Sequence, residues 1–211
     1  RLTMRRLSGS NAVDLDGNYH VFDFDHCEDI LVEDCAAYGS GRILFNYWSS
    51  QRGTFRRCWG QWKENRRGSV KTALTCYGSG DCIVENCVMT MAPGVAVSVE
   101  GIKINRRDGN PFGSRNKIYS NIVYGLSSSG SSGFITQGNE IIEDNEWFNN
   151  VSIGNAYGFY QRNDLNLRVN RVTIAECNEK GFTQTPYCKN DPAYECSWRV
   201  NSNVKNSSII K

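Results

Sequence analysis

One stretch of the chain, residues 51–71, concentrates side chains suited to holding an anionic sugar. It contains seven basic residues against the single acid Glu64, a local charge of about +6, with two tryptophans among them. Indole faces stack on pyranose rings, and guanidinium groups bind carboxylate or sulfate through two parallel hydrogen bonds. We therefore predict a strip that binds an acidic polysaccharide, formed by Arg52, Arg56, Arg57, Trp59, Trp62, Lys63, Arg66 and Arg67. The structural alternative places Trp59 in the core and leaves the arginines on a solvated turn.

The same region supplies groups that could cleave such a polymer. A polysaccharide lyase needs a cation to neutralise the uronate and a base to remove the C5 proton, and the candidates are Arg56, Lys63, Arg66 and Glu85. A glycoside hydrolase would use two carboxylates, but Glu33 and Glu85 would have Arg56 between them, which fits poorly with hydrolase geometry. The sequence shows no nucleophile elbow, phosphate loop or Ser/His/Asp arrangement. Whether the protein is an enzyme stays open at this point.

Carboxylates gather near the start of the chain, where they alternate with apolar residues. The candidates for a metal site are Asp14, Asp16, Asp23 and Asp25. Calcium prefers such oxygen ligands, although the spacing lacks the full calcium-loop pattern and its closing Glu. Solvated carboxylates are the alternative interpretation. We expect no required cofactor, with calcium as the one candidate.

Nine cysteines favour an oxidising compartment, and therefore an extracellular or cell-surface location. Two pairs, Cys76 with Cys82 and Cys188 with Cys196, are spaced to close short loops by disulfides. No CxxC is present and the chain has two histidines, so zinc, haem c and thioredoxin-like sites lack their ligands.

Length and composition indicate a single domain, 1–211, that folds and is too polar to insert into a membrane. The 24 basic and 22 acidic residues nearly cancel, so the whole chain provides no general attraction for nucleic acid. A nucleic-acid partner is accordingly disfavoured, even though the 51–71 strip would suit one locally.

An internal repeat defines the fold class. A four-residue pattern recurs about every 28–29 residues: an apolar residue, a variable residue, then Asn, Asp or Arg, and often Cys. The chain shows no sustained helical period. The repeats begin at Met4, Val32, Phe55, Val84, Tyr119, Ile142, Val169 and Val204. A second strand lies in each repeat, as in 21–24 and 102–104, and a third is expected at 12–15 and 95–99.

Strands repeated in this way must stack on their equivalents, so sequence positions become columns. The outward column after each repeat start is predicted to be Arg5, Glu33, Arg56, Glu85, Ser120, Glu143, Asn170 and Lys205. The alternating signs of its first four members predict a structural ion ladder, with Arg56 and Glu85 as functional candidates on the same face. Cys35, Cys58 and Cys87 form a buried column beside it, which is expected to fill the core.

Units such as Ile83-Val84-Glu85-Asn86-Cys87 resemble those of the right-handed parallel β-helix proteins of the pectin-lyase-like type, and the likeness covers nearly the whole chain. Three inserts that break the repeat rhythm predict loops near 105–116, 125–133 and 183–196, and the domain is expected to lack its terminal caps. The resemblance implies an all-β, right-handed parallel β-helix of seven to eight coils. It also implies a turn ladder of amides at the position of Asp34, Asn86, Asn121, Asp144 and Asn206. Arg57 and Arg171 at that position are departures.

Two functions follow from these observations. The first is an extracellular or surface module that binds, and in an enzyme version cleaves, an acidic polysaccharide. The second is a structural or adhesive shaft or filament subunit that stacks end to end on copies of itself, without catalysis.

Overall fold

The structure of the protein is a computed structural model. It describes residues 1–12, 19–63, 71–106, 112–138, 142–161, 164–165, 167–176, 180–184, 203–205 and 208–210.

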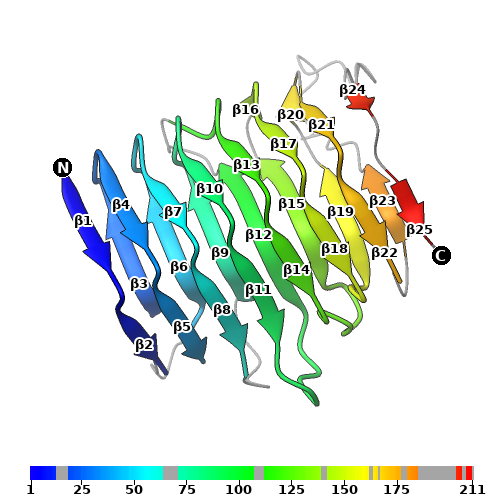
Figure 1. The fold of residues 1–211 in the computed structure, drawn as a ribbon, viewed down its shortest axis with the longest axis horizontal. Coiled ribbons are helices and arrows are strands. Elements are labelled where there is room, and N and C mark those ends of the chain that lie inside the picture. The colour runs from blue at the N-terminus through cyan, green and yellow to red at the C-terminus, as the bar shows by residue number, and fades with distance from the viewer. Residues whose placement is uncertain are drawn as a thin grey trace, which may run out of the picture.

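Three parallel sheets, here named A, B and C, run side by side along the length of the molecule (Figure 1). Sheet A consists of β1 (Leu2–Arg5), β4 (Ile30–Glu33), β7 (Thr54–Arg56), β10 (Ile83–Glu85), β13 (Lys117–Tyr119), β17 (Glu146–Phe148), β21 (Arg168–Asn170) and β24 (Asn203–Lys205). Sheet B consists of β2 (Ser8–Ser10), β5 (Ala36–Gly39), β8 (Trp59–Trp62), β11 (Val88–Met91), β14 (Ile122–Tyr124), β18 (Val151–Ile153), β22 (Thr173–Ala175) and β25 (Ser208–Ile210). Sheet C consists of β3 (His20–Asp25), β6 (Ile43–Trp48), β9 (Lys71–Tyr77), β12 (Val99–Arg106), β15 (Ser132–Gly138), β19 (Tyr157–Gln161) and β23 (Lys180–Gln184). A two-stranded sheet pairs β16 (Ile142–Glu143) with β20 (Asp164–Leu165).

The chain visits the three sheets in turn, and each strand pairs with the strand of the same sheet one repeat later. The described part of the chain is all-β, and its arrangement is compatible with a parallel β-helix solenoid, as the repeat predicts. Within the described ranges, no helix has the length and apolar character needed to cross a membrane.

The register of sheet A confirms the predicted column of Val32, Phe55 and Val84, which pair in line and are buried. The fifth and sixth repeat starts were wrong, because Ile118 and Trp147 occupy the buried column there. Tyr119 follows Ile118 in the strand and therefore points outward. Ile142 lies in β16 and pairs with Asp164, outside sheet A. It was predicted as a repeat start because it is an apolar residue followed by acidic residues, as in the true repeats.

The third strand of each repeat also lies elsewhere than expected. It follows sheet A after a sharp turn, as β5 and β8 do, and forms sheet B. Residues 95–98 are outside any strand and lead into β12, and residues 13–15 of the expected strand at 12–15 are outside the described residues. Sheet B strands such as Ala36–Gly39 are short and rich in small residues, which hides them from a search for apolar alternation.

The sharp turn between sheets A and B places one residue per repeat at positive φ, between 50° and 57°. These residues are Arg6, Asp34, Arg57, Asn86, Ser120, Asn149 and Arg171. Their backbone N–H groups continue the ladder between strands, as in Arg57 N to Glu85 O at 3.0 Å. Arg57 and Arg171 therefore share one backbone position with Asn86, although they depart from the amide pattern in residue type.

The amide ladder predicted from the resemblance lies one residue further along, in the buried column Cys35, Cys58, Cys87, Asn121 and Asn150. Asn121 is the predicted member that belongs to it. Its Oδ1 accepts from Cys87 N at 2.9 Å, and its Nδ2 donates to Asn150 Oδ1 at 3.0 Å. Asp34 and Asn86 occupy the preceding turn residue, Asp144 lies in a different turn, and Asn206 is outside the described residues.

The six cysteines in the described part of the chain are free thiols. Cys35, Cys58 and Cys87 fill the core as predicted. The predicted disulfide between Cys76 and Cys82 was wrong: both thiols are buried, and Cys82 Sγ donates to Gly80 O at 3.3 Å instead. The Cys188–Cys196 pair lies outside the described residues.

Of the three predicted loops, the one at 125–133 is described: residues 125–131 connect sheet B to sheet C, and residues 132–133 already belong to β15. It is anchored by Leu126 N to Asn155 Oδ1 at 2.9 Å and by Ser128 Oγ to Val95 O at 2.6 Å. In the other two, 105–106 belong to β12 and 183–184 to β23, and residues 107–111 and 185–196 are outside the described residues.

Candidate functional site: the charged face of sheet A

The outward face of sheet A carries a continuous row of ion pairs, because each strand places its last residue beside that of the next strand. Arg5, Glu33, Arg56 and Glu85 are consecutive in this register. Arg5 Nε lies 2.6 Å from Glu33 Oε2, and Arg56 Nη1 lies 3.5 Å from Glu33 Oε1. The Arg56 Nε also donates to Glu85 Oε1. The ion ladder predicted for the first four repeats is therefore confirmed.

The next two positions of the row are aromatic. Tyr119 and Phe148 stand where Ser120 and Glu143 were expected, and their rings stack with centroids 4.7 Å apart at 11°. The Tyr119 hydroxyl donates to Glu85 Oε2, which joins the aromatic pair to the ion ladder. The alternation along the strand could have shown this. Ile118 is the buried apolar residue at the strand centre, so the next residue, Tyr119, points outward.

The carboxylates of this face lie beneath the guanidinium groups. The side chains of Arg5 and Arg56 are 59% and 38% exposed, whereas those of Glu33 and Glu85 are 7% and 10% exposed. A ligand approaching this row therefore meets the guanidinium groups of Arg5 and Arg56 before it meets the carboxylates of Glu33 and Glu85, although the formal charges of the four residues cancel.

The electrostatics of the face follow from these contacts. Burial raises the pKa of Glu33, but the hydrogen bond from Arg57 and the charges of Arg5 and Arg57 outweigh it and hold the pKa below its ordinary value. Burial, followed by the hydrogen bond to Glu85, raises the pKa of Tyr119 to about 12. At neutral pH the face therefore presents ionised Glu33 and a protonated Tyr119.

A second row of charges follows the turn between sheets A and B. Arg57 binds Asp34 with a fork of two bonds, Nε to Oδ1 at 2.7 Å and Nη2 to Oδ2 at 3.0 Å, and also reaches Glu33 Oε1 at 2.7 Å. The hydrogen bond from Arg57 is the main cause that lowers the pKa of Asp34.

A third row follows the turn between sheets C and A. Its residues share a positive φ between 53° and 58°: Asp29, Arg52, Asp81, Arg115 and Asp144. Arg52 binds Asp29 through Nε at 2.8 Å and Glu28 through Nη2 at 2.6 Å. Arg115 binds Asp81 through Nε at 2.8 Å and Nη2 at 2.7 Å.

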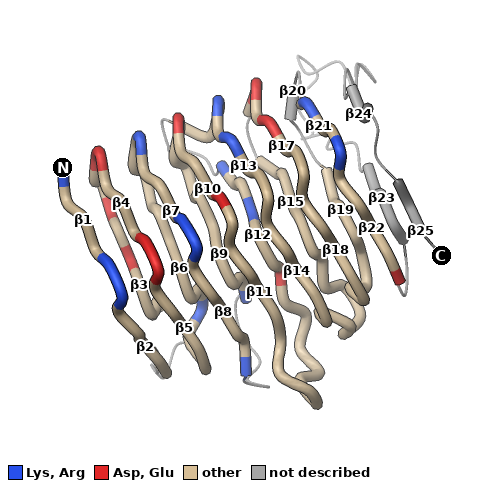
Figure 2. The backbone as a smooth tube through the Cα atoms, in the orientation of Figure 1, with Lys and Arg blue, Asp and Glu red and all other residues tan. Residues whose placement is uncertain are grey.

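The three rows are in phase, so each strand of sheet A, taken with its two flanking turns, carries charges of one sign. We name these sets the charged stripes. The positive stripes are Arg1, Arg5 and Arg6 at β1, Arg52, Arg56 and Arg57 at β7, Arg115 and Lys117 at β13, and Arg168 and Arg171 at β21. The negative stripes are Glu28, Asp29, Glu33 and Asp34 at β4, Asp81 and Glu85 at β10, and Glu143, Asp144 and Glu146 at β17. From β1 to β21 the signs alternate without exception among the described residues (Figure 2).

The structure divides the predicted 51–71 strip between different surfaces. Arg52, Arg56 and Arg57 form one positive stripe. Trp59 begins β8 and is 38% exposed on sheet B, whereas Trp62 is fully buried and has no free face for a sugar. Two tryptophans three residues apart in one strand must point to opposite faces, so alternation along β8 could have shown this.

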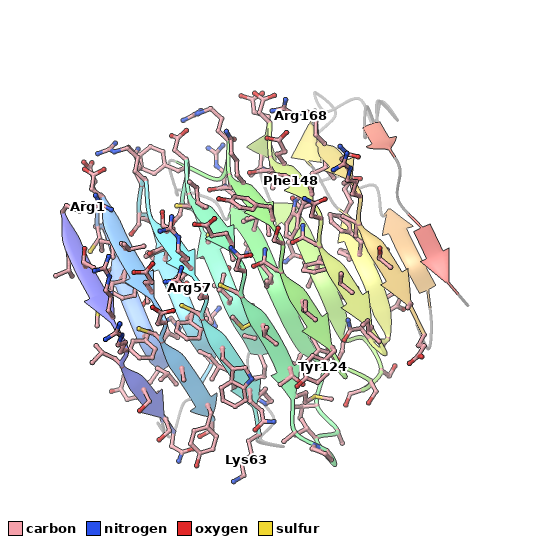
Figure 3. The ribbon with its side chains drawn as sticks, viewed as in Figure 1. Arg1, Arg57, Lys63, Tyr124, Phe148 and Arg168 are labelled. Carbon is pink, nitrogen blue, oxygen red and sulfur yellow. The ribbon has the colours of Figure 1, made fainter. Side chains whose placement is uncertain are left out.

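Lys63 follows β8 and lies away from Arg57, at the far end of the sheet B strand (Figure 3). Its Nζ lies 5.6 Å from the centroid of the Tyr38 ring. Arg66 and Arg67 are outside the described residues. Of the four predicted catalytic candidates, the structure thus brings Arg56 and Glu85 together and places Lys63 on another sheet.

The acidic residues proposed for calcium do not converge where they are described. Asp23 Oδ1 accepts from Asn46 Nδ2 at 2.7 Å and its Oδ2 lies 3.1 Å from His20 Nδ1, whereas Asp25 Oδ1 lies 2.6 Å from His26 Nδ1. Across the described ranges, no group of three or more His, Cys, Asp or Glu side chains is placed to hold a metal ion. Asp14 and Asp16 are outside those ranges, so the calcium site stays a prediction.

Comparison of the chain with family models, with curated proteins and with solved structures finds no match. The candidate site therefore rests on the geometry of the described residues.

Proposed function

We propose that the protein is a right-handed parallel β-helix module of seven to eight coils, related in architecture to the pectin-lyase-like proteins, that acts outside the cell or at its surface and binds an acidic polysaccharide along sheet A. The observation that carries the proposal is the layering of charge, with exposed Arg5 and Arg56 above buried Glu33 and Glu85. Exposed guanidinium groups still have N–H donors for a carboxylate or sulfate, while the acids that fix them are shielded from the ligand.

The Tyr119–Phe148 stack extends the same face with an apolar surface on which a pyranose ring can lie. Cationic forks and an aromatic platform on one sheet are the two elements that such a polymer requires. The binding residues are accordingly Arg5, Arg56, Arg57, Tyr119 and Phe148, in place of the continuous 51–71 strip.

The geometry favours binding over cleavage. Glu85 is held by Arg56 and Tyr119 together, and Glu33 is engaged by Arg5, Arg56 and Arg57. A pKa of about 12 leaves Tyr119 protonated at neutral pH, so it is not a general base for removing a C5 proton. We therefore propose a binding module, and a lyase or hydrolase activity would require groups other than these.

Binding is tested by titrating the protein with sodium polygalacturonate and with hyaluronan in low salt, using calorimetry. The variant Arg5→Gln with Arg56→Gln is expected to weaken binding at least about tenfold, because two charge-assisted contacts are lost. Lys63→Gln removes the same type of charge from sheet B and is the matched control, expected to bind like the wild type.

Unchanged affinity in the double variant, or equal losses in the control, would refute sheet A as the binding face. Circular dichroism of each variant verifies folding. If the double variant unfolds, Arg5→Gln alone, which leaves the Arg56–Glu85 pair intact, replaces it and is expected to weaken binding by a smaller factor. Absorbance from an unsaturated product, followed with the same polymers, tests for lyase activity.

A second candidate function is the structural or adhesive shaft. It is favoured by the ion pairs that link neighbouring strands from β1 to β13 and by the buried Cys and Asn column, which together hold successive repeats to one another. Sedimentation at several concentrations distinguishes the two, since growth of large species without any polysaccharide would support end-to-end assembly, whereas a concentration-independent monomer would exclude it.

A further inference from the structure

The charged stripes have a spatial period that a polymer lying along sheet A would encounter. Neighbouring strands of a sheet are about 4.8 Å apart, so stripes of the same sign recur about every 9.6 Å. The positive stripes at β1, β7, β13 and β21 are separated by the negative stripes at β4, β10 and β17 (Figure 2). The period of charge along the face is therefore two strands.

A sugar residue in an extended polysaccharide advances by close to one strand spacing. A polymer with a charged group on every sugar would consequently place half of its charges over negative stripes. The negative stripes repel an approaching anion, because the side chains of Glu28 and Asp29 at the edge of β4 are 63% and 50% exposed. Like charges brought together in this way oppose binding.

A polymer with a charged group on every second sugar avoids this conflict. Its carboxylates can all lie over positive stripes, beginning with the exposed Arg5 and Arg56 two strands apart. Its uncharged sugars then lie over β4, β10 and β17. At β17 the outward residue of the row is Phe148, stacked on Tyr119, which offers a ring surface to an uncharged pyranose.

We propose that sheet A selects an acidic polysaccharide whose charged group recurs on every second sugar, in preference to one in which every sugar is charged. This inference rests on the proposed polysaccharide-binding function and adds the charge period of the ligand to it. The negative stripes contribute to the selection as much as the positive ones, because they repel a polymer in which every sugar is charged.

The test compares two unsulfated polymers at equal carboxylate concentration and equal ionic strength. Hyaluronan carries one carboxylate per disaccharide, and polygalacturonate carries one per sugar. The wild-type protein is expected to bind hyaluronan about tenfold more tightly per carboxylate, since half of the polygalacturonate charges meet acids. Equal or tighter binding of polygalacturonate overturns the inference and leaves the proposed function standing, whereas failure of both polymers to bind overturns the proposed function itself.

A variant isolates the negative stripes. Glu28→Gln with Asp29→Asn removes two exposed acids at β4 and leaves Arg5, Arg56 and Arg57 with their partners. It also releases Arg52 from its ion pairs, which favours both polymers, so the readout is the ratio of the two affinities. The variant is expected to reduce the preference for hyaluronan by raising the affinity for polygalacturonate more. Lys63→Gln, on sheet B, is the matched control and should leave the ratio of the two affinities unchanged. An unaltered ratio in the acid variant would contradict selection by charge period. Because the wild-type comparison needs no variant, the inference stays testable if the acid variant fails to fold.

Discussion

Replacing Asn121 with Ala tests the buried ladder that holds neighbouring repeats together. Asn121 Oδ1 accepts the backbone N–H of Cys87 at 2.9 Å, and its Nδ2 donates to Val84 O at 3.0 Å as well as to Asn150 Oδ1. The alanine variant leaves one buried N–H and one buried carbonyl without these partners. At about 1–3 kcal/mol for each unsatisfied group, we expect the free energy of unfolding to fall by about 2–6 kcal/mol.

The same column supplies the control. Cys87 makes weaker versions of the same two contacts, accepting from Cys58 N at 3.4 Å and donating to Phe55 O at 3.7 Å. Asn121→Cys should therefore be destabilised less than Asn121→Ala. Urea unfolding, followed by tryptophan fluorescence, to which buried Trp62 and Trp147 contribute, measures both variants. A loss below about 1 kcal/mol for Asn121→Ala, or a cysteine variant as unstable as the alanine one, would refute the role assigned to the ladder.

Three further predictions concern the charged face and the packing of sheet C. Arg56→Glu places a third carboxylate between two others and should destabilise the fold by on the order of 2 kcal/mol, with Arg56→Lys milder in the same urea assay. Because the pKa of Tyr119 is raised to about 12 in the folded state, its contribution to stability is complete below the ordinary value of 10 and is lost as the pH rises toward 12. A Tyr119→Phe variant should lack this component of the alkaline loss, and an identical pH profile would contradict the raised pKa of Tyr119, which comes first from burial and then from the hydrogen bond to Glu85. Gly101→Ala would place a Cβ 2.3 Å from the backbone oxygen of Gly133, so we expect a loss of about 1–3 kcal/mol or more in thermal unfolding, and a neutral variant would contradict this packing.

The sequence was sufficient for the sheet A column over four repeats, because its spacing is marked twice in three of them. A buried apolar residue precedes the charge and a cysteine follows it, as in Val84, Glu85 and Cys87. After Cys87 the cysteines give way to Asn121 and Asn150 in the same column. The second marker is then lost, and the predicted column is displaced by one residue, to Tyr119 in place of Ile118.

The binding strip was harder to predict because charge and sequence proximity do not report which sheet a residue belongs to. Arg57 and Trp59 are two residues apart, yet the turn at Arg57 separates sheet A from sheet B. The stacking of Tyr119 on Phe148 joins residues 29 positions apart and depends on the exact register of β13 and β17. Such contacts come from strand pairing, which short local patterns leave undetermined.

The alternation of the stripes also explains why arginines can occupy a strained backbone position. A residue other than glycine in the left-handed region costs roughly 1–2 kcal/mol. Arg57 has φ 50° and therefore bears this cost in free energy. The two hydrogen bonds from its side chain to Asp34, one repeat away, offset it. Omitting one repeat from the pairing of sheet A would place Arg5 beside Arg56, Glu33 beside Glu85 and Arg6 beside Arg57, so like charges would meet in the first repeats. The turn arginines therefore contribute to the register of the whole sheet, and that same register sets the two-strand charge period on which the proposed ligand selection depends.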